Sequence, residues 1–204
     1  MQSGRSLEAV AQRVERASAL DRLAASAQGL GRKAIPEGPV KEVLQGTPLG
    51  HPLHPALVAV PIGAWASATL FDLLGDDAGA RRLTAIGCLA AVPAALAGGT
   101  DWLSTDGAQR RVGLVHAVLN DAALTCYTLS WRARRRGARR RGLVLSLAGG
   151  GLLGAGGWLG GHLAYSLGVG VDTTSFLDRR ARNDARHTDA DANTSELPSP
   201  TDTG

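Results

Sequence analysis

Four long apolar stretches with little charge constrain this chain more than any other feature. They run from about Pro52 to Leu74, Leu83 to Thr100, Val112 to Trp131 and Gly142 to Gly168. A helix needs about 20 mostly apolar residues to cross the hydrocarbon core of a bilayer, and four such stretches would overfill the core of a small soluble domain. The joining loops are short, which favours antiparallel neighbours. The sequence therefore predicts an all-α, four-helix transmembrane bundle that contacts the lipid bilayer as a multi-pass protein of the cell membrane.

Polar segments flank this apolar middle and define three expected regions. In residues 1–48, leucines and valines at three-to-four spacing predict an amphipathic helix over Ser6–Gly29, followed by a linker rich in proline and glycine. Residues 49–171 form the expected transmembrane domain, and residues 172–204 form a polar tail that we expect to be disordered. No cleavable signal is visible in residues 1–30. The two cysteines exclude a disulfide-rich fold and a four-cysteine metal site.

The loop between the third and fourth stretches carries a dense cluster of arginines: Arg132, Arg134, Arg135, Arg136, Arg139, Arg140 and Arg141. A short loop this basic indicates the cytoplasmic side of a membrane. Both termini would then lie on the opposite side, although the basic residues near the ends of the chain favour the reverse. Because topology accounts for the arginines, we expect no nucleic-acid partner.

Three histidines are expected at matched depth near one edge of the membrane. His54 precedes Pro55, which suits the first turn of a helix, so His54 should lie at the start of the first span. His116 falls about one turn inside the third span, and His162 lies near the end of the fourth. Antiparallel threading brings all three to the same edge, together with Asp101 at the end of the second span. Ionisable groups in membrane segments are costly and usually functional.

Histidines on facing membrane helices suit axial ligation of a haem b or binding of a transition metal. We expect His116 and His162 to be the axial pair, with His54 and Asp101 as a third ligand or as neighbours of the ligands. Asn120, one turn from His116, would accept from its second ring nitrogen and fix the tautomer. The glycines of the fourth stretch would make room for a flat ring or allow close helix packing. The alternative is a hydrogen-bonded network that only joins helices.

Three segments resemble a bacterial membrane family known only as a domain of unknown function (DUF 2231). They read GHPLHPALVAVPIGAW, GLVHAVLND and LGAGGWLGGHLAYSLGVGVDTTSF, and the resemblance covers roughly residues 40–176. It implies an integral membrane protein, and because some members carry a Rieske-type [2Fe–2S] domain after the last helix, it also implies electron transfer. No cysteine follows Phe176 here, so any redox partner would be a separate protein.

Three functions remain open from the sequence. The first is an electron-transfer module that holds haem b or a metal through His54, His116 and His162. The second is a non-catalytic membrane scaffold whose histidines are structural. The third is a small transporter or proton path that uses Asp121, although no inverted internal repeat is visible. We expect no enzyme, because the chain shows no nucleophile–base pair, phosphate loop or dinucleotide motif.

Overall fold

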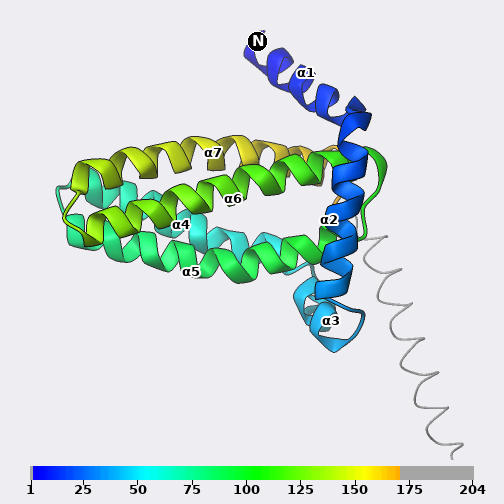
Figure 1. The fold of residues 1–204 in the computed structure, drawn as a ribbon, viewed down its shortest axis with the longest axis horizontal. Helices are drawn as coiled ribbons and strands as arrows, with labels where there is room; N and C mark the ends of the chain where they lie inside the picture. Colours follow the sequence, from blue (N-terminus) through cyan, green and yellow to red (C-terminus); the bar gives the residue numbers. More distant parts are fainter. Residues whose placement is uncertain (1, 171–204) are drawn as a thin grey trace, which may run out of the picture. The chain divides into compact units, whose positions relative to one another are not determined.

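Four long helices form the body of the molecule in the computed structural model, which describes residues 2–170 and the side chains from residue 7 onward. They are α4 (His54–Leu73), α5 (Asp77–Trp102), α6 (Gly107–Arg135) and α7 (Arg139–Tyr165). Each is long and apolar enough to cross a membrane, and residues 2–170 contain no strand. This confirms the predicted all-α transmembrane bundle (Figure 1). The tail predicted to be disordered lies outside the described residues.

The ends of the helices follow local chemistry. Helix α4 begins at His54 with Pro55 in its first turn, as predicted, because proline needs no hydrogen-bond acceptor there. Helix α5 is capped by Asp76, whose carboxylate accepts from the Gly79 amide at 2.9 Å. The turns after α4 and α6 both place a glycine in the left-handed region, with φ of 81° at Gly75 and 76° at Gly137. Glycine adopts this backbone without strain.

The two helical hairpins α4–α5 and α6–α7 repeat each other at an offset of 62 residues, which is the separation of Asp72 and Arg134. Helices α4 and α6 end at equivalent residues, and α5 and α7 begin at equivalent residues. The turn hydrogen bonds match, since Gly75 donates to the Asp72 carbonyl at 3.1 Å and Gly137 to the Arg134 carbonyl at 3.0 Å. The structure therefore contains two similar helical hairpins in succession along the chain.

This repeat is parallel, because both hairpins run in the same direction through the bundle. Both turns lie together at one end, at the left of Figure 1, which we call the arginine end. Helices α4 and α6 begin at the opposite end, which we call the histidine end. A parallel repeat implies a pseudo-two-fold axis along the membrane normal. The sequence analysis considered only an inverted repeat and missed this parallel one. The two hairpins share few identical residues: His54/His116, Leu57/Leu119, Gly75/Gly137, Leu83/Leu145, Gly87/Gly149, Gly98/Gly160 and Gly99/Gly161.

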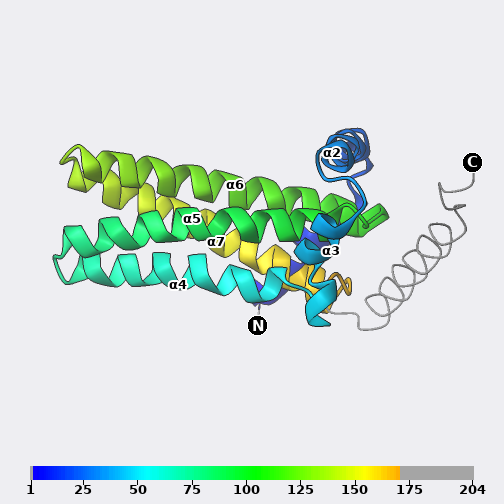
Figure 2. The same cartoon turned by 90° about the horizontal axis from the view of Figure 1, so that it is seen from below.

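An N-terminal arm covers the histidine end. It consists of α1 (Gln2–Arg16), a 3₁₀ turn (Ser18–Leu20), α2 (Asp21–Ala34), α3 (Pro39–Gln45) and a second 3₁₀ turn (Thr47–Leu49). The prediction of one helix over Ser6–Gly29 was wrong, because the chain breaks between α1 and α2, and the predicted linker contains α3. Figure 2 views α2 almost along its axis, so this helix lies across the direction of the bundle.

Polar and apolar contacts hold this arm in place. Ala11 of α1 is fully buried against Val112, Leu159 and Leu163. Gln28 of α2 donates from Nε2 to two main-chain carbonyls at the end of α5 and just after it, at 2.9 Å to Trp102 and 3.0 Å to Thr105. Together these contacts make the arm part of the helical body, while most of its other apolar side chains stay exposed.

An ion pair strengthens the same attachment. Arg111 of α6 donates to Asp21 at 2.7 Å from Nε and at 2.8 Å from Nη2, and Arg110 reaches the same carboxylate at 3.3 Å. The hydrogen bond from Arg111 is the main reason why the pKa of Asp21 lies below its ordinary value of 3.8. The charged form of Asp21 is therefore the form that the docked arm favours.

Candidate functional site

His54 and His116 occupy equivalent positions in the two hairpins and make equivalent hydrogen bonds. The His54 Nδ1 lies 2.8 Å from the carbonyl oxygen of Ala94 in α5, and the His116 Nδ1 lies 2.8 Å from that of Gly156 in α7. In each case the acceptor is 40 residues further along the chain. A carbonyl oxygen only accepts, so each Nδ1 carries a proton, and in the neutral imidazole Nε2 keeps its lone pair.

A glycine on the neighbouring helix supports each imidazole. A Cβ added at Gly98 would stand 2.8 Å from Nδ1 and Cε1 of His54, and one added at Gly160 would stand 2.8 Å from Cε1 of His116. Real Cβ atoms do not approach so closely, so any larger residue would displace the ring. The backbone of each partner helix thus fixes both the orientation and the tautomer of its histidine.

His54 and His116 lie at equivalent positions of α4 and α6, toward the histidine end. Helix α4 packs mainly on α5, and α6 mainly on α7, so the two rings come from different hairpins. Both histidines are half-buried rather than sealed in the core. The structure therefore places two of the three histidines that the sequence singled out at equivalent positions of the two hairpins.

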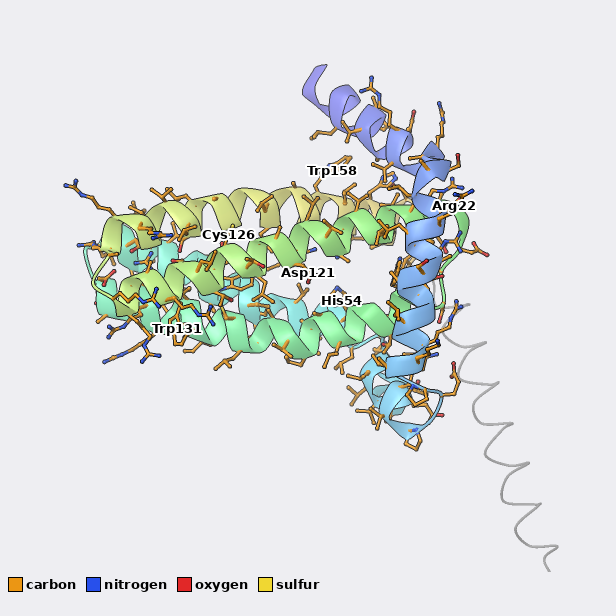
Figure 3. The ribbon with its side chains drawn as sticks, viewed as in Figure 1. Arg22, His54, Asp121, Cys126, Trp131 and Trp158 are labelled. Carbon is orange, nitrogen blue, oxygen red and sulfur yellow. The ribbon has the colours of Figure 1, made fainter. Side chains whose placement is uncertain are left out.

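The third predicted ligand, His162, is bound elsewhere. Its Nε2 lies 2.6 Å from Oε1 of Glu15 in α1, and its ring stacks on Trp158 with the centroids 6.0 Å apart. Figure 3 shows Trp158 projecting from α7 toward α1. Within residues 2–170 no three histidine, cysteine or acidic side chains are grouped so that they could hold one metal ion. The expected set of His54, His116 and His162 does not form.

Asn120 and Asp101 also differ from the expected site. Asn120 donates from Nδ2 to the main-chain carbonyl of His116 at 2.8 Å and lies 3.2 Å from its Nε2. The Gly156 carbonyl, rather than Asn120, fixes the tautomer of His116. Asp101 is buried near the end of α5, at the histidine end, but it belongs to no metal-binding group among the described residues.

The comparison with protein-family models identifies the chain. Residues 50–173, which include all four long helices, match the family described as "Predicted membrane protein (DUF2231)". The protein belongs to this family. No curated protein and no solved structure matches the chain. Membership in DUF2231 agrees with a multi-pass membrane protein whose spans contact lipid.

An aromatic pair fills the middle of the DUF2231 domain, and the sequence analysis missed it. Trp65 of α4 and Tyr127 of α6 stack with the centroids 4.1 Å apart and an interplanar angle of 3°. Each ring lies on an equivalent glycine, Gly87 or Gly149. These positions are also separated by the repeat offset, so two equivalent side chains, one from each hairpin, meet between α4 and α6. Recognition of the repeat would have predicted this contact.

A buried ion pair joins the hairpins of the DUF2231 domain at the arginine end. The Arg134 side chain is fully buried and donates to Asp72 at 2.6 and 2.7 Å and to Asp77 at 2.9 Å. The sequence analysis counted Arg134 with the exposed arginines of the loop. Arg134 is separated from the acidic residue Asp72 by the repeat offset. This spacing is the sequence signal that distinguishes Arg134 from the exposed arginines beside it.

Proposed function

We propose that this membrane protein holds a haem b between His54 and His116 and acts as an electron-transfer module. One observation carries the proposal: two imidazoles from different hairpins, at equivalent positions, each have Nδ1 bound to a carbonyl and Nε2 available. This is the protonation state that a metal-binding imidazole needs. The pair replaces the His116–His162 pair expected from the sequence.

The set of donors favours haem over a bare metal ion. A structural or catalytic site for a bare transition metal normally takes three or four protein ligands, and the described residues offer no such group. A haem supplies four nitrogens itself and needs only axial ligands from the protein. Bound haem provides one-electron transfer.

The residues around the pair would act on binding and orientation. The Ala94 and Gly156 carbonyls hold the Nδ1 protons and thereby raise the basicity of each Nε2. Gly98 and Gly160 let each ring lie directly against a helix backbone. Asn120 brings an amide group within 3.2 Å of the His116 Nε2, where it would compete for that lone pair in the absence of a ligand.

The test is an absorption spectrum of the purified protein in mild detergent, expressed in a host that makes haem. We expect a Soret band and about one haem per chain by pyridine haemochrome assay. His54→Ala and His116→Ala should each lower the haem content at least tenfold, while His162→Ala should retain it. His51→Ala is the matched control, because His51 is exposed and only three residues from His54. A folded, colourless preparation would overturn the proposal.

A non-catalytic scaffold is the second candidate, and the bonding of the histidines favours it. Each of the three membrane histidines already has a partner within the described residues: Ala94, Gly156 or Glu15. Hydrogen bonds between membrane helices are sufficient to stabilise a bundle. In this case His→Ala variants should lower the thermal stability of the protein without removing any bound group, and a partner protein should co-purify.

A further inference from the structure

Asp121 is an acidic residue at the midpoint of a membrane-spanning helix, and neither the fold nor the proposed site accounts for it. It lies midway between the first and last residues of α6, and Figure 3 labels it there. The residue is exposed in the monomer. A carboxyl group that faces hydrocarbon is costly, and such residues normally face protein or water.

Among residues 7–170, no side chain donates a hydrogen bond to this carboxyl or forms an ion pair with it. Thr125, one turn away, donates its hydroxyl to the main-chain carbonyl of Asp121 at 2.8 Å and not to its side chain. Within residues 54–165 there is no lysine, and every arginine lies in the first or last two turns of a long helix or in the turn between α6 and α7. They are therefore far in depth from the middle of α6.

The surroundings of Asp121 form an exposed ridge suited to helix contact. Ala117, Asp121, Thr125 and Leu129 follow one another at four-residue spacing and are all exposed. Residues at this spacing form one ridge of a helix. Small side chains on such a ridge let two membrane helices approach closely. Here two small residues stand one turn on either side of the carboxyl.

We propose that α6 crosses the α6 of a second copy of this chain at Asp121, so that the protein is a homodimer in the membrane. In a two-fold interface a residue on the axis faces its own counterpart, so Asp121 at the crossing point meets Asp121 of the second copy. A carboxyl that carries its proton donates to the carboxyl of the partner, so each polar group gains a hydrogen bond and leaves the lipid. A second copy suits this chemistry because, like the first, it offers a carboxyl and no lysine or arginine at this depth.

Disulfide cross-linking in native membranes tests the interface. The background variant is Cys88→Ala with Cys126→Ala, since both native cysteines are free. In this background, Thr125→Cys and Ala117→Cys should give a cross-linked dimer on mild oxidation, at a yield at least fivefold above Leu89→Cys. Leu89 is the matched control, because it is 74% exposed on α5 and away from the proposed ridge.

A second set of variants links the dimer to the carboxyl. In the Thr125→Cys background, Asp121→Asn should keep most of the cross-linking because an amide still forms hydrogen bonds. Asp121→Leu should lower it at least threefold while the purified protein stays folded and helical. Equal cross-linking at all positions, or a monomer mass in nanodiscs, would overturn the proposal. A stoichiometric partner of a different sequence bound at Asp121 would overturn it as well.

Discussion

In His54 and His116, a main-chain carbonyl decides which ring nitrogen carries the proton. This matters because a histidine binds metal only through a nitrogen with a lone pair. The helix backbone can approach so closely only where glycine lies under the ring, as at Gly98 and Gly160. The chemistry of the proposed site therefore depends on two residues that have no side chain.

Gly160→Ala tests this dependence directly. The new Cβ would stand 2.8 Å from the His116 ring, so we expect the ring to move, haem content to fall, and stability to drop by about 1–3 kcal/mol, as for an overpacked core. Gly157→Ala is the control, because nothing lies within 4 Å of a Cβ there. Haem assays and thermal unfolding would check both variants. Equal effects of the two variants would contradict the proposed packing.

At the scale of elements, charges attach helices to one another at both ends of the bundle. Arg134 ties α6 to α4 and α5 at the arginine end, and Asp21 and Glu15 tie the N-terminal arm to α6 and α7 at the histidine end. The predicted amphipathic arm is present, but it is broken into α1 and α2, so Glu15 in α1 contacts α7 and Asp21 in α2 contacts α6.

Removal of Arg134 should be strongly destabilising. Arg134→Met leaves Asp72 buried without its cation, and breaking a buried pair in this way costs about 3–5 kcal/mol. Arg136→Met, in the exposed part of the same loop, should change stability by less than about 0.5 kcal/mol. Unfolding in detergent mixtures would measure both. A mild effect of Arg134→Met would mean that water reaches this pair.

The ion pair of Asp21 predicts how docking of the arm responds to acid. Because the pKa of Asp21 in the folded protein is below 3.8, the pair adds stability above that pH and loses it as the pH falls through the lowered value. Hydrogen exchange in α2, corrected for intrinsic rates, should therefore stay slow from pH 7 to pH 5 and rise below about pH 3.8. Asp21→Asn should speed hydrogen exchange in α2 at every pH and remove the increase below about pH 3.8. If the increase in acid persists in Asp21→Asn, a titrating group other than Asp21 causes it.

At the scale of the whole molecule, the tandem hairpin predicts that its equivalent positions are partly interchangeable. The double variant Asp72→Arg with Arg134→Asp should recover part of the stability that either single change removes, because the two sites are related by the pseudo-two-fold axis. Recovery should be incomplete, since Asp77 beside Arg134 corresponds to Arg139 in the other hairpin. Thermal unfolding of the three variants measures this. A double variant no more stable than the singles would contradict the symmetry.

The sequence was sufficient to predict the four spans and the family, because hydrophobic stretches and the histidine motifs are local signals. It placed His54 at the start of a helix for the same reason. It did not predict the hydrogen bond of His162, because its partner Glu15 lies 147 residues away and no local pattern connects them. It missed the Trp65–Tyr127 stack and the buried role of Arg134 because the hairpins share few identical residues, so the repeat is clear only from the coordinates.

The pair of Asp72 and Arg134 has a consequence for the history of the chain. Two identical hairpins that associate as separate molecules carry the same residue at this position, and like charges would then face each other. Once both hairpins belong to one polypeptide, each copy accepts its own substitutions. Covalent linkage thus permits an attraction that a symmetric pair of identical hairpins would lack. It also permits Asn120 and Asp121 to occur in one hairpin alone.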